Sequence, residues 1–74
     1  MLKVNDRVEV VELFHLGAAS PRVGVTIGSI GTVKGIDPLH HFPYLVKLDN
    51  GTVENFEYAE LSLLRVAPDG DSQS

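Results

Sequence analysis

The sequence predicts an all-β protein built from five short strands that close into a small barrel. Three observations lead to this fold. Apolar and polar residues alternate with a period of two in several segments, which is typical of half-buried strands. No segment keeps the 3.6-residue apolar period over the ten or so residues that a helix needs. The dipeptide Asn50-Gly51 stands between two alternating segments, and it is the strongest short signal for a β-hairpin.

The first two predicted strands lie on either side of a long loop. RVEVVE, residues 7–12, alternates valines with charged residues and predicts the first strand. IGTVKGID, residues 30–37, predicts the second, and its glycines Gly31 and Gly35 indicate a bend or a β-bulge. The loop between them, residues 13–29, has no regular period.

The second half of the chain predicts a hairpin, a helical turn and a closing strand. YLVKL, residues 44–48, forms the third strand, and TVENFE, residues 52–57, returns as the fourth. A type I′ turn at Asn50-Gly51 joins them, because this turn requires positive φ at both central positions. YAEL, residues 58–61, predicts one helical turn, and SLLRV, residues 62–66, predicts the fifth strand.

Size and composition predict one small cytoplasmic domain. The chain has 74 residues, no cysteine, ten acidic against six basic residues and a net charge of −4. No apolar run reaches the roughly 20 residues that span a bilayer, and the N-terminal segment MLKVNDRVEV lacks the apolar core of a signal peptide. We expect a barrel over residues 1–66 and a disordered polar tail, APDGDSQS, over residues 67–74.

Three stretches resemble the SH3-like and KOW-like small β-barrels. VNDRVEVVE is similar to their Gly-Asp-Arg-Val opening, with Asn5 where glycine is usual, and IGTVKGID and YLVKLDNGT…F…AEL resemble the rest of the pattern. The resemblance covers residues 2–66 and extends to a small SH3-like component of photosystem I, the variable chain of ferredoxin–thioredoxin reductase and small barrel proteins of bacteria and phages. It implies a five-stranded SH3-like barrel with a long first loop and one helical turn before the last strand. These motifs specify a fold more than an activity.

The two loops supply the predicted contact residues, because loops on a rigid barrel usually carry binding contacts. In DPLHHFPY, residues 37–44, we expect Phe42 to anchor a partner, with His40 and His41 as a polar rim. The alternative is that Leu39 or Phe42 caps one end of the barrel and the histidines are solvated. In the first loop the predicted contact residues are Phe14 and His15. Its apolar residues either fold over the barrel or form an exposed patch.

We expect no catalytic residue, metal site or cofactor. A metal site needs at least three ligands, and adjacent histidines on an extended backbone point in opposite directions. We expect Glu54, Glu57 and Glu60 to form a solvated acidic face, because a barrel this small has no cleft to shift their pKa values. A further resemblance, to the plasmid type II dihydrofolate reductase, carries over no site. The positions nearest its Val-Gln-Ile-Tyr run read VENF, residues 53–56.

The sequence therefore predicts a non-enzymatic binding module, an accessory or regulatory subunit that contacts a protein partner through its loops. The first alternative is a KOW-like nucleic-acid contact through basic residues, namely Arg7, Arg22, Lys34 and Lys47. The net negative charge disfavours it, because phosphate binding normally needs a basic patch. The second alternative is a symmetric oligomer with a ligand site between its protomers.

Overall fold

The computed structural model describes residues 2–13 and 24–66, and within them the protein is all-β, as the sequence predicts. Five antiparallel strands form one sheet, and a 3-10 turn precedes the last strand. The elements in chain order are β1 (Arg7–Val10), β2 (Ile30–Ile36), β3 (Tyr44–Leu48), β4 (Val53–Phe56), the 3-10 turn η1 (Tyr58–Glu60) and β5 (Leu61–Arg65).

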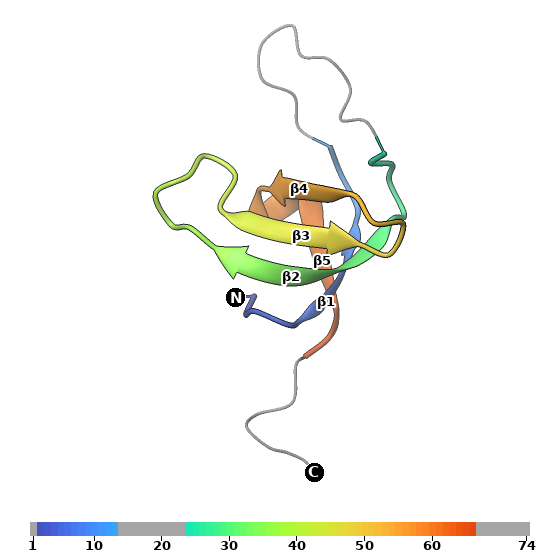
Figure 1. Cartoon of the computed structure of the whole chain (residues 1–74), viewed down its shortest axis with the longest axis horizontal. Helices are drawn as coiled ribbons and strands as arrows, with labels where there is room; N and C mark the ends of the chain where they lie inside the picture. Colours follow the sequence, from blue (N-terminus) through green and yellow to red (C-terminus); the bar gives the residue numbers. More distant parts are fainter. Residues whose placement is uncertain (1, 14–23, 67–74) are drawn as a thin grey trace, which may run out of the picture.

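The sheet folds over on itself. Its strand order is β4-β3-β2-β1-β5, so β1 is the strand that pairs with both β2 and β5. In Figure 1, β5 passes behind the layer that β2, β3 and β4 form. The outermost strands, β4 and β5, are not hydrogen-bonded to each other. The ladder therefore has two ends, and closure into a barrel stays a prediction.

The core lies between the two layers and follows the predicted alternation. Val8 and Val10 of β1 point inward and are fully buried, whereas their neighbours Arg7 and Glu9 are only half-buried. Leu13, at the start of the first loop, packs against this core. The buried apolar cluster consists of Leu2, Val8, Val10, Val25, Val33, Tyr44, Val46, Leu48, Phe56 and Leu61.

The hairpin at Asn50-Gly51 forms, but its turn is not type I′. Gly51 has a φ of 94°, whereas Asn50 is not among the non-glycine residues with positive φ. The Gly51 amide donates to the Leu48 carbonyl at 2.9 Å, and the Leu48 amide donates to the Thr52 carbonyl at 2.8 Å. The loop therefore has three residues and ends on a left-handed glycine, the next most common way to close a hairpin.

The amide side chain of Asn50 accounts for its place in this turn. Its Oδ1 accepts a hydrogen bond from the Thr52 amide at 2.8 Å, and its Nδ2 donates to the Gly24 carbonyl at 2.9 Å. The second bond connects the hairpin to the C-terminal end of the first loop, which leads into β2. That end also contributes Val25 to the core. Asn50 thus acts through its side chain rather than through its backbone conformation.

Asn5 occupies a backbone conformation that favours glycine. Its φ is 78°, and its amide donates to the Val33 carbonyl at 2.7 Å. Asparagine tolerates the left-handed region better than other side-chain-bearing residues. This conformation explains how Asn5 can stand where the resembled barrels usually have glycine.

Candidate contact surfaces

The loop over residues 37–43 is held in one shape by Asp37. The Asp37 amide donates to the Pro43 carbonyl at 2.8 Å, which closes the loop at its base. The Asp37 carbonyl accepts from the His40 amide at 3.0 Å, and its side-chain Oδ1 accepts from the Leu39 amide at 3.1 Å. The loop is therefore preorganised although it projects from the sheet.

Within this loop the structure presents Leu39 rather than Phe42. The Phe42 side chain is buried, with 8% of its surface exposed, whereas Leu39 is 95% exposed. His40 and His41 are exposed, and the Phe42 amide donates to Nδ1 of His40 at 2.9 Å. In this arrangement Phe42 supports the loop from below. The contact roles of these residues stay predictions, and Phe14 and His15 lie outside the described residues.

Two buried acids are structural, and one of them corrects a prediction. Glu60 does not belong to a solvated acidic face, because its side chain is fully buried and accepts a hydrogen bond from the Glu57 amide at 2.8 Å. Asp6 is also buried, and its Oδ2 accepts from the Lys3 amide at 2.8 Å. Both carboxylates thus bond the backbone of a neighbouring turn. Across residues 2–13 and 24–66, no group of three or more His, Cys, Asp or Glu side chains could hold a metal ion.

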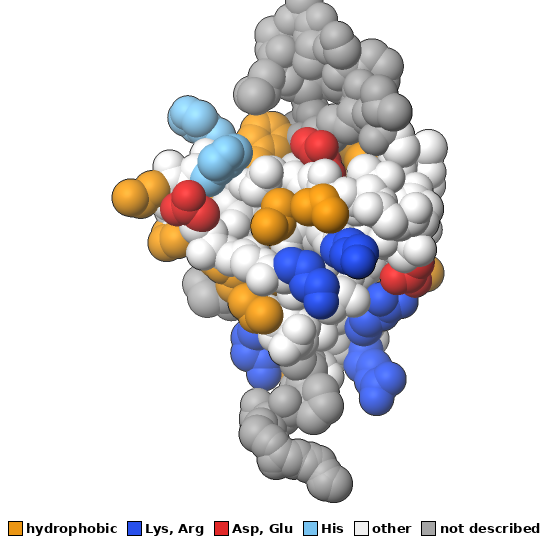
Figure 2. Space-filling view, in the orientation of Figure 1, with side chains coloured by type: hydrophobic (Ala, Val, Ile, Leu, Met, Phe, Trp, Pro, Cys, Tyr) orange, Lys and Arg blue, Asp and Glu red, His pale blue; other side chains and the backbone are white. Residues whose placement is uncertain are grey.

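Basic residues from three strands gather on the outer side of the sheet. The register places Arg7 opposite Thr32 and Thr32 opposite Lys47, so their side chains follow one cross-strand row. Lys34 lies two residues beyond Thr32, at the β-bulge that the sequence predicts near Gly35. Figure 2 shows Lys and Arg side chains over the front of this face, with acidic side chains at its margins.

We call Arg7, Lys34 and Lys47 the cationic face. Lys34 and Lys47 line a shallow, open depression of about 440 Å³ together with the residues of the hairpin turn. Within the described part of the chain, neither ammonium group forms an ion pair or a hydrogen bond. Arg22, the other residue of the nucleic-acid alternative, lies outside the described residues.

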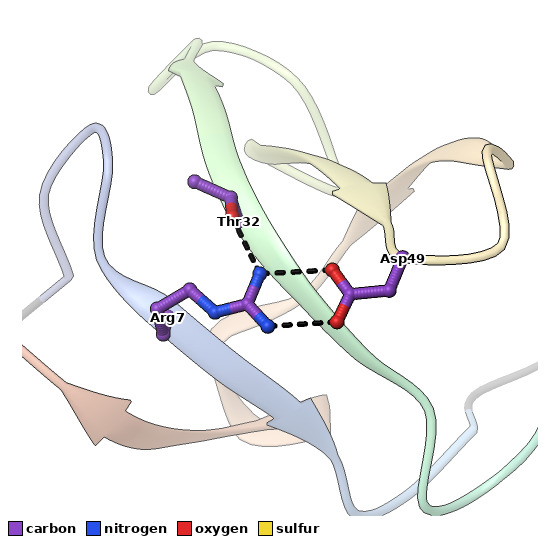
Figure 3. Close-up of polar contacts among 3 residues, drawn as sticks. All are labelled: Arg7, Thr32 and Asp49. Atoms are coloured by element: carbon purple, nitrogen blue, oxygen red, sulfur yellow. Dashed lines mark hydrogen bonds and ion pairs between the residues drawn. The ribbon is translucent and has the colours of Figure 1, made fainter.

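Arg7 differs from the two lysines because it forms a bidentate salt bridge with Asp49. Its two terminal nitrogens donate to the two carboxylate oxygens of Asp49 at 2.9 and 2.7 Å (Figure 3). One of these nitrogens also donates to the Thr32 hydroxyl at 2.9 Å. The contact crosses β2 and ties β1 to the hairpin turn. The hydrogen bonds from Arg7 lower the pKa of Asp49, and the same bonds raise the pKa of Arg7.

This pair predicts a loss of stability in acid. Because the pKa of Asp49 is lower in the folded chain than its ordinary value, its contribution is complete above that ordinary value and disappears as the pH falls through the folded pKa. We expect Asp49→Asn to flatten the acid end of the stability profile, measured by urea unfolding at a series of pH values. Arg7→Gln should have the same effect, and adding it to Asp49→Asn should change the profile no further. If both variants lose as much stability in acid as the unaltered protein does, solvent screens the pair completely.

Comparison with known proteins adds no assignment to these surfaces. No family model, curated protein or solved structure matches the chain. None of the described residues belongs to a helix with the length and hydrophobicity needed to cross a membrane. The function of the protein must therefore be inferred from the geometry of the chain itself.

Proposed function

We propose that this protein is a non-enzymatic binding module that contacts a protein partner through the loop over residues 37–43. The observation that carries the proposal is the exposure of Leu39, 95%, in a loop closed by backbone hydrogen bonds. A preorganised loop loses little conformational entropy on binding. An apolar side chain that is fully in water gains the most when a partner's pocket encloses it.

The residues of the loop have different parts in this contact. Leu39 is the anchor, and the exposed His40 and His41 form the polar rim around it. Phe42 is buried beneath them, so its part is to hold the loop rather than to touch the partner. In such a role the protein is an accessory or regulatory subunit. We place it in the cytoplasm, since a chain without cysteine suits a reducing compartment.

Affinity capture with a matched control tests this proposal. The tagged protein is incubated with native lysate, and the bound proteins are quantified by mass spectrometry. We expect Leu39→Ser to reduce retention of the main partner at least about tenfold, as expected for a central contact residue. Ile27→Ser should leave retention unchanged, because Ile27 is also exposed but lies on a different loop. Equal retention by both variants and the unaltered protein would contradict the proposal.

Nucleic-acid binding through the cationic face is the second candidate function. It is favoured by the position of Lys34 and Lys47, because both residues line one depression and their ammonium groups have no partner among the described residues. Such groups can replace the counterions of a phosphate backbone. Arg7 would contribute less, since Asp49 already balances its charge.

The salt dependence of binding tests this second candidate. With a labelled duplex oligonucleotide in a fluorescence anisotropy titration, affinity should fall steeply as salt rises. Replacing both Lys34 and Lys47 with Ser should weaken binding and reduce the slope of log K against log salt by about 2, one for each lost phosphate contact. Binding that is absent at low salt, or insensitive to both substitutions, would remove this candidate.

A further inference from the structure

The outer edge of β5 is unusually apolar for a strand at the end of a sheet. One edge of β5 pairs with β1, and no strand among the described residues pairs with the other. Leu63, Leu64 and Val66 are 43%, 49% and 55% exposed along or just beyond it. Proteins usually protect such edges with charges, proline or a short strand, because the unpaired backbone groups can hydrogen-bond to a strand of another chain. Arg65 is the only charged residue in β5.

We propose that β5 pairs in antiparallel orientation with β5 of a second copy of this chain, so that the two sheets become continuous. This dimer is a second interaction, separate from the proposed partner contact, which uses the loop over residues 37–43. A strand edge is self-complementary in the antiparallel orientation, because each copy offers alternating N–H and C=O groups to the other. The same pairing would bury the exposed side chains of Leu63 and Leu64.

The β-bulge in the β1–β5 ladder selects the register of this pairing. In a regular strand Ser62 and Arg65 would point to opposite faces. Here Ser62 is opposite Glu9 and Arg65 is opposite Arg7, with the register shift between them. The bulge therefore turns Ser62 and Arg65 toward the same outer face. Ser62 can thus stand opposite Arg65 of the second copy, which also places Leu63 opposite Leu64.

Charge complementarity supports this register. Ser62 would lie between Glu9 of its own chain and Arg65 of the second copy, and these two residues would be about 10 Å apart in backbone position, or two strand spacings. Extended arginine and glutamate side chains can meet across that distance. Glu9 is half-buried and makes no ion pair within the described ranges. Within one chain, by contrast, Arg65 lies opposite the like charge of Arg7.

Sedimentation of the purified protein tests the dimer without reference to any other partner. We expect the mass to rise from monomer toward dimer between micromolar and near-millimolar concentration. Leu64→Lys should weaken association at least about tenfold, since it places a charge in the paired edge. Val53→Lys is the matched control, because Val53 is 53% exposed on β4, the other end of the sheet. Circular dichroism and thermal unfolding should show that both variants keep the fold.

Either of two results would overturn the proposal. The unaltered protein could remain monomeric throughout this range, or Val53→Lys could weaken association as much as Leu64→Lys does. A cross-linking experiment then tests the register, because the chain has no cysteine of its own. A mixture of the Ser62→Cys and Arg65→Cys variants should form a disulfide rapidly on oxidation, since directly opposed residues have the separation that a disulfide requires. Each variant alone should cross-link slowly; equal rates would contradict the pairing.

Discussion

Gly31→Ala is expected to lower the free energy of unfolding by about 3 kcal/mol, the upper range for overpacking in a well-packed interior. A Cβ atom at this position would stand 2.6 Å from the Lys47 carbonyl oxygen and 2.9 Å from the Leu48 Cα. Both are backbone atoms of β3, and β3 is held by ladders on both of its sides. The added methyl group can therefore be accommodated only if β2 and β3 separate.

The chain offers a matched control in the same strand. A Cβ atom on Gly35 would meet only the Leu45 side chain, at 3.9 Å, which is an ordinary contact. Gly35→Ala should therefore change stability by no more than about 0.5 kcal/mol. Urea unfolding of both variants at neutral pH measures the difference. If the two substitutions cost the same, the approach of β2 to β3 is not limited by backbone contact at Gly31.

These two glycines illustrate what a strand pattern can and cannot specify. The sequence predicts a bend or a β-bulge at both positions, and it does not predict a close approach of the neighbouring backbone. Gly35 stands at the bulge, where the register shifts, whereas Gly31 is at a close approach. The distinction depends on the neighbouring strand, which the local sequence does not contain.

The strands themselves could be predicted because their alternation has a direct physical cause. A residue such as Val46 is buried and its neighbour Lys47 is exposed because consecutive side chains point to opposite faces. The strand ends were less predictable. The first strand stops at Val10 rather than Glu12, because the Val11 and Glu12 amides both donate to the Glu60 carbonyl. Those bonds join residues far apart in the chain, so no local pattern encodes them.

The contact surfaces were predictable only in outline. The proline-bracketed stretch over residues 37–43 does form a separate loop, but its composition could not show which apolar residue points inward. Leu39 and Phe42 are both large apolar residues, and only the folded loop shows that Leu39 is exposed and Phe42 is buried. The basic residues of the cationic face could be named from the sequence as a possible nucleic-acid contact, but their position on one face could not. They are spread from Arg7 to Lys47, and the strand register brings them together despite a net charge of −4.

Glu60 connects η1 to the rest of the fold through a reciprocal set of hydrogen bonds. Its side chain accepts from the Glu57 amide at 2.8 Å, while the Glu57 side chain accepts from the amides of Tyr58 and Glu60. This arrangement is a capping box, which satisfies the amides that begin a helical turn. The Glu60 carbonyl also accepts from the Val11 amide at 2.8 Å. The residue thus joins the end of β1 to the connection between β4 and β5.

Glu60→Ala is therefore expected to lower the free energy of unfolding by about 3 kcal/mol, because it removes the acceptor of a shielded amide and leaves a cavity. Glu60→Gln keeps an oxygen at the same position and should cost about 1 kcal/mol. Glu12→Ala, at a solvent-exposed position nearby, should cost no more than about 0.5 kcal/mol. Urea unfolding at neutral pH compares the three variants. Equal small losses for Ala and Gln at position 60 would mean that the side-chain hydrogen bond contributes little and that backbone pairing alone holds η1 against β1.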